Sequence, residues 1–251
     1  MYTIEERERL RETLVVTARA DQRISGAAIT GSGALGAGDR WSDLDLAFGI
    51  ADAARLRDVL ADWTQVMYRD HGALHHVDVS FGAAIYRVFL LGSTLQVDLA
   101  FFPAAEFGAT HPTFRLLFGT AVERAHAPPP TAALLIGWGW LYALHARSCI
   151  QRGRLWQGEY MVSGVRDHTL ALAAIRHGLP ADQGRGMDRL PRDETAPLEA
   201  ALVRALDAAE LRRAFRAATD GLLAEIQHAD PELAERLRAP FLELNDPARS
   251  G

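Results

Sequence analysis

The pattern of apolar and polar positions divides the chain into two regions. In the first region, helical periodicity predicts helices over 3–20 and 52–70, and short alternating or apolar runs predict strands over 24–31, 42–50, 74–81, 85–92 and 94–102. Thr3 precedes the first helix and Glu6 follows three residues later, which is the spacing of a capping box. Gly92-Ser93 lies between the last two strand-like runs and predicts a hairpin, hence antiparallel pairing.

The second region begins at Pro128-Pro129-Pro130, and beyond it only helical periodicity remains. We predict helices over 131–152, 154–178, 196–206, 208–228 and 230–245. The prolines are the strongest break in the pattern, so we expect one domain over 1–127 and another over 128–251. The expected fold class is α+β, with a small mixed sheet and flanking helices followed by a C-terminal helical bundle. One face of the helix over 131–152, carrying Trp138, Tyr142, His145 and Cys149, is expected in the core.

Composition excludes several function classes. The net charge of −5 disfavours a nucleic-acid partner, because nucleic-acid readers need a basic field. All 27 basic residues are arginine, so no lysine is available to hold a phosphate or form a Schiff base. Cys149 is the only cysteine, which fits a cytoplasmic protein without disulfides. The charged first residues are no secretory signal, and the longest apolar run, 132–144, is shorter than the roughly 20 residues that span a bilayer.

Glycines 31, 33 and 36 form the pattern G-x-G-x-x-G, the fingerprint of dinucleotide-binding folds. In those folds a helix follows the glycines directly, because its N-terminus receives the pyrophosphate. Only five residues separate Gly36 from the predicted strand at Ser42, and a crossover between parallel strands needs roughly a dozen or more. The acidic residue expected about 20 positions on would be Asp52, which opens a helix after that strand has ended. The sequence therefore argues against a dinucleotide site.

Asp43 and Asp45 form a second motif, D-x-D, directly after these glycines. On a strand both side chains point to one face, while Leu44 and Leu46 point to the other. Two neighbouring carboxylates repel each other, and a divalent cation is the usual reason for such a pair. Hard oxygen ligands favour Mg²⁺, so the motif predicts a magnesium site.

The motifs together resemble the nucleotidyltransferases of the DNA polymerase β superfamily. That pattern is an apolar strand ending in Gly-Ser, a loop of about ten residues, and Ser-Asp-x-Asp on the next strand, here Gly31-Ser32 and Ser42-Asp43-Leu44-Asp45. A third carboxylate is expected on a later strand, and "LQVDLAFF" supplies Asp98. The resemblance covers residues 24–103. The helical remainder resembles, more loosely, the C-terminal bundle of the enzymes that modify aminoglycosides and lincosamides.

The resemblance implies a role for each site residue. Gly31 and Ser32 would hold the triphosphate of an NTP, helped by Arg40 and Ser42 and, from the helical region, Arg166. Asp43, Asp45 and Asp98 would coordinate Mg²⁺, in the form of two ions, and Asp98 or Glu106 would accept the proton of the attacking hydroxyl. Glu159, on one helix face with Ser163 and Arg166, would bind the acceptor. The family's triphosphate-binding lysine has no counterpart here, so arginine, Ser32 and backbone N–H groups would have to serve.

The function that the resemblance implies is Mg²⁺-dependent transfer of a nucleoside monophosphate, AMP from ATP, to a hydroxyl of a small molecule. An aminoglycoside- or lincosamide-like antibiotic bound between the two domains is the expected acceptor. Three alternatives remain open: a toxin-like enzyme that modifies tRNA or a protein, a nucleotide-binding regulatory protein, and a glycosyltransferase that uses the D-x-D motif on a UDP-sugar. The oligomeric state is not predicted.

Overall fold

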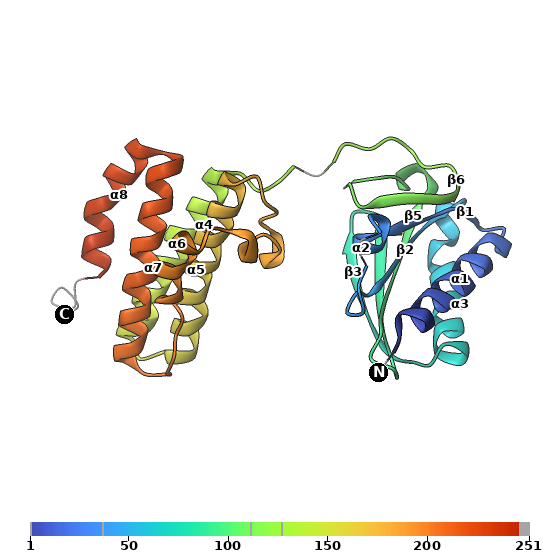
Figure 1. Ribbon diagram of the computed structural model, residues 1–251, viewed down its shortest axis with the longest axis horizontal. Helices are drawn as coiled ribbons and strands as arrows, with labels where there is room; N and C mark the ends of the chain where they lie inside the picture. The colour runs from blue at the N-terminus through green and yellow to red at the C-terminus, as the bar shows by residue number, and fades with distance from the viewer. Residues whose placement is uncertain (1, 37, 111, 127, 246–251) are drawn as a thin grey trace. The chain divides into compact units, whose positions relative to one another are not determined.

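The computed structural model describes residues 2–36, 38–110, 112–126 and 128–245, and it is of the α+β class (Figure 1). The chain divides into two compact units, Met1–Ala127 and Pro128–Gly251, each with its own hydrophobic core. The first unit holds the whole sheet, and the second holds only helices in its described part. No helix among the described residues is long and apolar enough to cross a membrane.

The first unit is built on a six-stranded mixed sheet with the strand order β3-β4-β5-β2-β1-β6. Its strands are β1 (Ile24–Thr30), β2 (Leu44–Ile50), β3 (Ala73–Phe81), β4 (Ala84–Leu91), β5 (Gln96–Pro103) and β6 (Phe114–Gly119). Only the central pair, β2 and β5, runs parallel, and every other neighbouring pair is antiparallel. The antiparallel pairing of β4 with β5 confirms the predicted hairpin.

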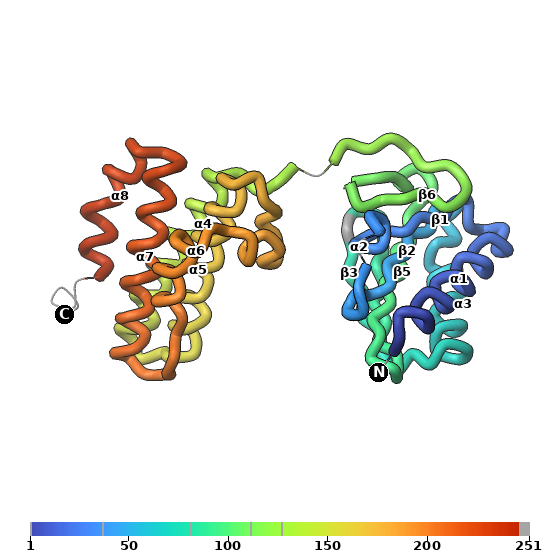
Figure 2. The backbone as a smooth tube through the Cα atoms, in the orientation of Figure 1, coloured from blue at the N-terminus to red at the C-terminus, as the bar shows by residue number. Residues whose placement is uncertain are grey.

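Two helices, α1 (Ile4–Ala20) and α3 (Leu56–Asp70), cover one face of this sheet, as both Figure 1 and Figure 2 show. The predicted capping box at the start of α1 is present, with Thr3 and Glu6 bonded to each other's backbone N–H groups. Alternate residues of β2 and β5 point toward these helices, and the rings of Phe48, Trp63 and Phe101 meet in the core. The sheet therefore has one fully covered face.

The opposite face of the sheet carries small residues along its centre. Ala28, Ala47 and Ala100 lie side by side on β1, β2 and β5, and Phe107 packs over them beyond the carboxyl ends of β2 and β5. Residues 45 and 98 lie two positions before Ala47 and Ala100. Their side chains therefore project from the same face, at the amino end of the two strands. The short helices α2 (Gly31–Ala34) and η2 (Ala104–Glu106) follow β1 and β5.

Strand β6 was not predicted from the sequence. It pairs with β1 at the edge of the sheet, and each of its residues is exposed or half-buried. It therefore has neither a clean alternation nor a buried apolar run. Strands β1 to β5 and helices α1 and α3 of the first unit lie close to their predicted positions, although β2 begins at Leu44 rather than at residue 42. Helix α3 is preceded by the short helix η1 (Ala53–Arg55), which the carboxylate of Asp52 caps.

The second unit is a bundle of the helices α4 (Ala132–Gln151), α5 (Leu155–Arg176), α6 (Arg192–Glu199), α7 (Ala208–Ala229) and α8 (Pro231–Leu244), with the short helices η3 (Asp182–Gly184) and η4 (Met187–Arg189). The predicted helix over 196–206 is wrong, because α6 ends at Glu199. The Arg213 guanidinium donates to the carbonyl groups of Ala200 and Leu202, and Glu210 accepts from the N–H of Arg204 at 2.8 Å. These side chains take up the backbone groups that a continued helix would use.

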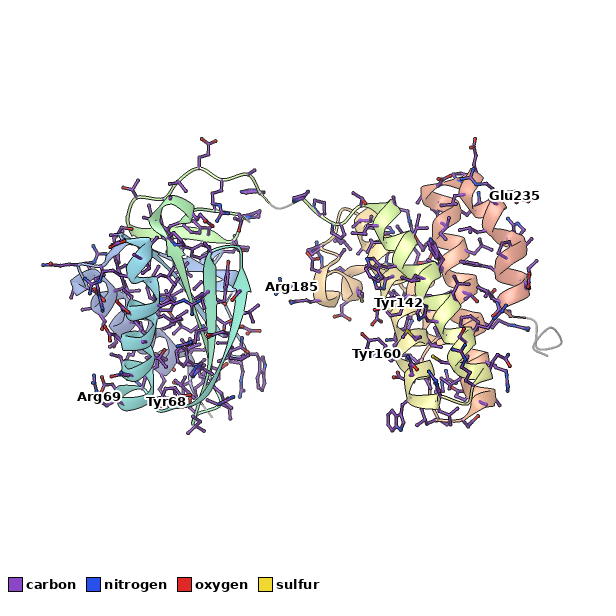
Figure 3. All side chains as sticks on the ribbon, turned by 180° about the vertical axis from the view of Figure 1, so that it is seen from behind. Tyr68, Arg69, Tyr142, Tyr160, Arg185 and Glu235 are labelled. Carbon is purple, nitrogen blue, oxygen red and sulfur yellow. The ribbon has the colours of Figure 1, made fainter. Side chains whose placement is uncertain are left out.

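The expected core face of α4 is also wrong in part. Cys149 is buried, but Trp138 is 46% exposed and lies with Tyr142 in an aromatic cluster at the surface. Tyr142 on α4 and Tyr160 on α5 lie side by side in this cluster, with ring centroids 6.3 Å apart (Figure 3). The stripe that α4 buries has small residues at its centre, such as Gly139, against which Leu222 of α7 packs closely.

Candidate metal centre

Three carboxylates meet at the amino ends of β2 and β5. Asp43, Asp45 and Asp98 each offer an oxygen atom, and these atoms all lie within 4.8 Å of one another. Asp45 and Asp98 are register partners on the two parallel strands, which places their side chains next to each other on the face away from α1 and α3. The sequence predicted Asp43 on the strand, whereas the residue comes just before β2. Its carboxylate nevertheless reaches the other two.

The electrostatics of this cluster favour a cation. Burial raises the pKa of Asp98 to about 6, and the negative charge of Asp43 adds to the rise, while a hydrogen bond from Gln96 opposes it. The Gln96 amide donates to both oxygens of Asp98, at 3.0 and 3.1 Å, and lies 3.4 Å from an oxygen of Asp43. One neutral amide cannot balance this negative charge, whereas a divalent ion with hard oxygen ligands would. The donor set therefore fits Mg²⁺.

Gly31 brings the chain into close contact with the cluster. Its φ of +61° lies in the left-handed region, and a Cβ atom there would overlap the carboxylate of Asp45. Only glycine combines this conformation with this approach. The backbone of Gly31, at the start of α2, therefore lies directly against one of the three carboxylates, and Ser32 is the next residue of that helix.

The loop before β2 is held by a turn centred on Asp39. Its carboxylate accepts from the N–H of Trp41 at 2.8 Å and from the hydroxyl of Ser42 at 3.1 Å, and the Trp41 bond in particular lowers the pKa of Asp39. The Ser42 hydroxyl also accepts from the N–H of Asp39, at 2.9 Å. Ser42 was predicted to bind nucleotide, but here its hydroxyl is engaged in shaping the turn that presents Asp43.

Arg7 on α1 is a residue that the sequence analysis missed. Its guanidinium is buried and donates to the carbonyl groups of Asp39 and Ser42, the second at 2.9 Å. The hydroxyl of Tyr2 donates to the same Ser42 carbonyl at 3.1 Å. Arg7 lies seven residues before the buried Leu14, so an arginine on the apolar face of this helix was the available signal. These bonds tie the approach to the metal centre to α1.

Glu106, predicted as an alternative proton acceptor, is not brought to the cluster. It lies in η2 beyond Pro103, and the five residues from Asp98 to Pro103 span about 16 Å of strand. Its carbonyl instead accepts from Arg124 at 2.7 Å. Arg40 does belong to the loop before the cluster, where its guanidinium stacks on the ring of Trp41 at 4.4 Å.

The predicted residues of the helical region belong to the second unit and have their own partners. The Ser163 hydroxyl donates to the carboxylate of Glu159 at 2.8 Å, so the predicted polar face of α5 exists at this point. Arg166 is paired with Asp167 at 2.8 Å. Neither Glu159 nor Arg166 is among the carboxylates and neighbours that form the metal centre in the first unit.

Comparisons with known proteins give limited information. No protein-family model matches the sequence, and no curated protein matches it. Among solved structures, the chain is similar to an aminoglycoside 6-adenyltransferase from Bacillus subtilis, over 97% of this chain and 99% of that one, with a TM-score of 0.34 and 12% identity. That neighbour is a nucleotidyltransferase, but the likeness is weak. The acidic cluster itself has to carry a functional conclusion.

Proposed function

We propose that the chain is a Mg²⁺-dependent nucleotidyltransferase that moves AMP from ATP to a hydroxyl group of a small molecule. The observation that carries the proposal is the meeting of Asp43, Asp45 and Asp98 within 4.8 Å, with the backbone of Gly31 against Asp45. Three converging carboxylates beside a glycine turn suit a metal ion that carries a triphosphate. The choice of ATP and of an aminoglycoside- or lincosamide-like acceptor rests on the family resemblance.

Each residue contributes a separate task. Asp43, Asp45 and Asp98 would hold Mg²⁺, which when bound neutralises charge on the phosphate oxygens. The hydroxyl of Ser32 and the backbone N–H groups beside it would donate to the triphosphate, in place of the lysine that this chain lacks. Arg40 would add positive charge from the loop before β2. The turn of Asp39 and Ser42, fixed by Arg7, keeps Asp43 in reach of the other two carboxylates.

The transfer step needs a group that removes a proton. An acceptor hydroxyl forms a bond to the α-phosphorus of ATP, the bond from that phosphorus to pyrophosphate breaks, and the hydroxyl proton is released. Asp98 is the best-placed base, because it reaches the cluster from a different strand than Asp43 and Asp45 and would stay ionised beside a bound cation. The family resemblance additionally assigns Glu159 of the second unit to acceptor binding.

The experiment that tests this function is a pyrophosphate-release screen. Each of the four NTPs is combined with Mg²⁺ and a panel of aminoglycosides, lincosamides and tRNA, using the wild-type chain and Asp98→Asn. The proposal predicts release with ATP and one class of antibiotic, and loss of release in the variant by about a hundred- to ten-thousand-fold. Release in equal amounts from wild type and Asp98→Asn would contradict it.

A further inference from the structure

A hollow on the second unit is lined by four arginine side chains. It has a volume of about 340 Å³ and lies among α4, α7 and α8, away from the aromatic cluster of Tyr142 and Tyr160. Arg147 comes from α4, and the other three, Arg212, Arg213 and Arg216, come from α7. Among the described residues, no acidic side chain lines it, although the whole chain carries a net charge of −5. Positive charge is therefore concentrated in this hollow, although the net charge of the protein is negative.

Arg212, Arg213 and Arg216 are exposed, and most of the four guanidinium groups make few bonds to the described residues. Arg213 is the exception, since it binds Glu210 and two backbone carbonyls. Arg212 and Arg216 each make one long bond to a backbone carbonyl, at 3.4 and 3.3 Å. Arg147 is half-buried, and within the described residues it has no hydrogen bond or ion pair. A partly desolvated guanidinium without a counter-ion is unfavourable unless a ligand supplies one.

The rest of the lining adds apolar surface. Ile150 and Phe215 give the hollow an apolar wall. The side-chain oxygen of Asn245 is buried and has no donor among the described residues, while its amide nitrogen donates to Thr219 at 2.9 Å. Because this oxygen is shielded from the hollow, it adds no contact for a ligand there. The lining thus combines guanidinium groups with an apolar wall.

We propose that this hollow is a binding site for a small organic phosphate, such as a sugar phosphate. Guanidinium groups match phosphate oxygens in pairs, which is why arginine prevails at such sites. The volume falls within the usual range for small-ligand pockets. Binding here needs no metal ion, because the charge of the ligand is met by arginine rather than by carboxylate-bound Mg²⁺. The site is therefore independent of the metal centre and of the proposed transfer reaction.

The test is calorimetric titration of the full chain with ribose 5-phosphate in the presence of EDTA. The double variant Arg147→Gln, Arg212→Gln removes the two guanidinium groups with the fewest bonds to the protein. The double variant Arg185→Gln, Arg236→Gln changes the charge equally at exposed positions outside the hollow of the same unit. Thermal unfolding of each variant checks that it is folded.

We expect saturable binding by wild type, at least about tenfold weaker binding by the Arg147 and Arg212 variant, and unchanged binding by the control. The variant Asp43→Asn, in the metal centre, should also bind normally. The proposal is overturned if wild type shows no saturable binding at millimolar concentrations, or if the control loses as much affinity as the hollow variant. Loss of binding in Asp43→Asn would place the ligand at the metal centre and would equally overturn it.

Discussion

Replacing Asp98 by asparagine should stabilise the protein while it removes activity. Asp98 is a partly buried carboxylate beside Asp43, and the pKa of its side chain is about 6, against an ordinary value of 3.8. The folded protein therefore binds the Asp98 proton more tightly than the unfolded chain does. The stabilisation from this proton is complete below about pH 4 and is lost as the pH rises through about 6.

The size of the effect follows from the pKa difference. Each tenfold change in proton affinity corresponds to about 1.4 kcal/mol, so the charged carboxylate would cost at most about 3 kcal/mol at pH 7. Asp98 keeps partial contact with water, and solvent screening reduces this to about 1–2 kcal/mol. Asparagine is neutral at every pH and can still accept from Gln96. For a domain of this size, the Tm at pH 7 without metal should rise by about 3–8 °C.

The assay is thermal unfolding of wild type, Asp98→Asn and Asp58→Asn at pH 4 and pH 7 in EDTA. Asp58 is an exposed residue of α3, and its substitution makes the same charge change outside the cluster. Asp98→Asn should be more stable than wild type at pH 7 and close to it at pH 4, and Asp58→Asn should differ little at either pH. A lower Tm for Asp98→Asn at pH 7, or the same difference at both pH values, would refute the reasoning.

Three further predictions concern the residues around the cluster. Ser32→Ala should weaken Mg·ATP binding by about tenfold, the effect of losing about 1.4 kcal/mol, and an unchanged Kd would show that the hydroxyl does not contact phosphate. Arg7→Met should lower the free energy of unfolding by about 1–3 kcal/mol, measured by urea titration, because the carbonyls of Asp39 and Ser42 lose their buried donor. Filter retention across a salt series should show no tight tRNA binding at physiological salt, since the net charge is −5; tight binding with a steep negative salt dependence would favour a tRNA-modifying enzyme.

The parts of the site that the sequence could predict are those set by local pattern. Asp43 and Asp45 are neighbours on the chain, and the apolar alternation around Asp98 marks its strand. Long-range contacts were not predictable in the same way. Arg7 acts on a loop more than 30 residues away, and nothing near it in the chain reveals its acceptors. Glu106 lies away from the cluster because Asp98 is near the start of β5 and Glu106 follows its end, a separation that depends on the exact bounds of the strand.

The helical region shows a related limit. The long helices α4, α5 and α7 follow from periodicity alone. The length of α6 does not, because the bonds from Arg213 and Glu210 that hold residues 200–204 come from another helix. On α4, periodicity identified an apolar face, but the small residues around Gly139 let α7 approach on a different one. Packing of this kind depends on which helix lies opposite, and a single sequence does not specify that.

The most direct test of the metal centre is the affinity of ATP with Mg²⁺ and with EDTA. Calorimetric titration would use a chain that carries Arg147→Gln and Arg212→Gln, so that the arginine-lined hollow does not contribute, with and without Asp43→Asn. We predict binding that requires Mg²⁺ and is lost when Asp43 is replaced. Equal ATP affinity in Mg²⁺ and EDTA, or equal affinity with and without Asp43→Asn, would contradict a nucleotide site built on Asp43, Asp45 and Asp98.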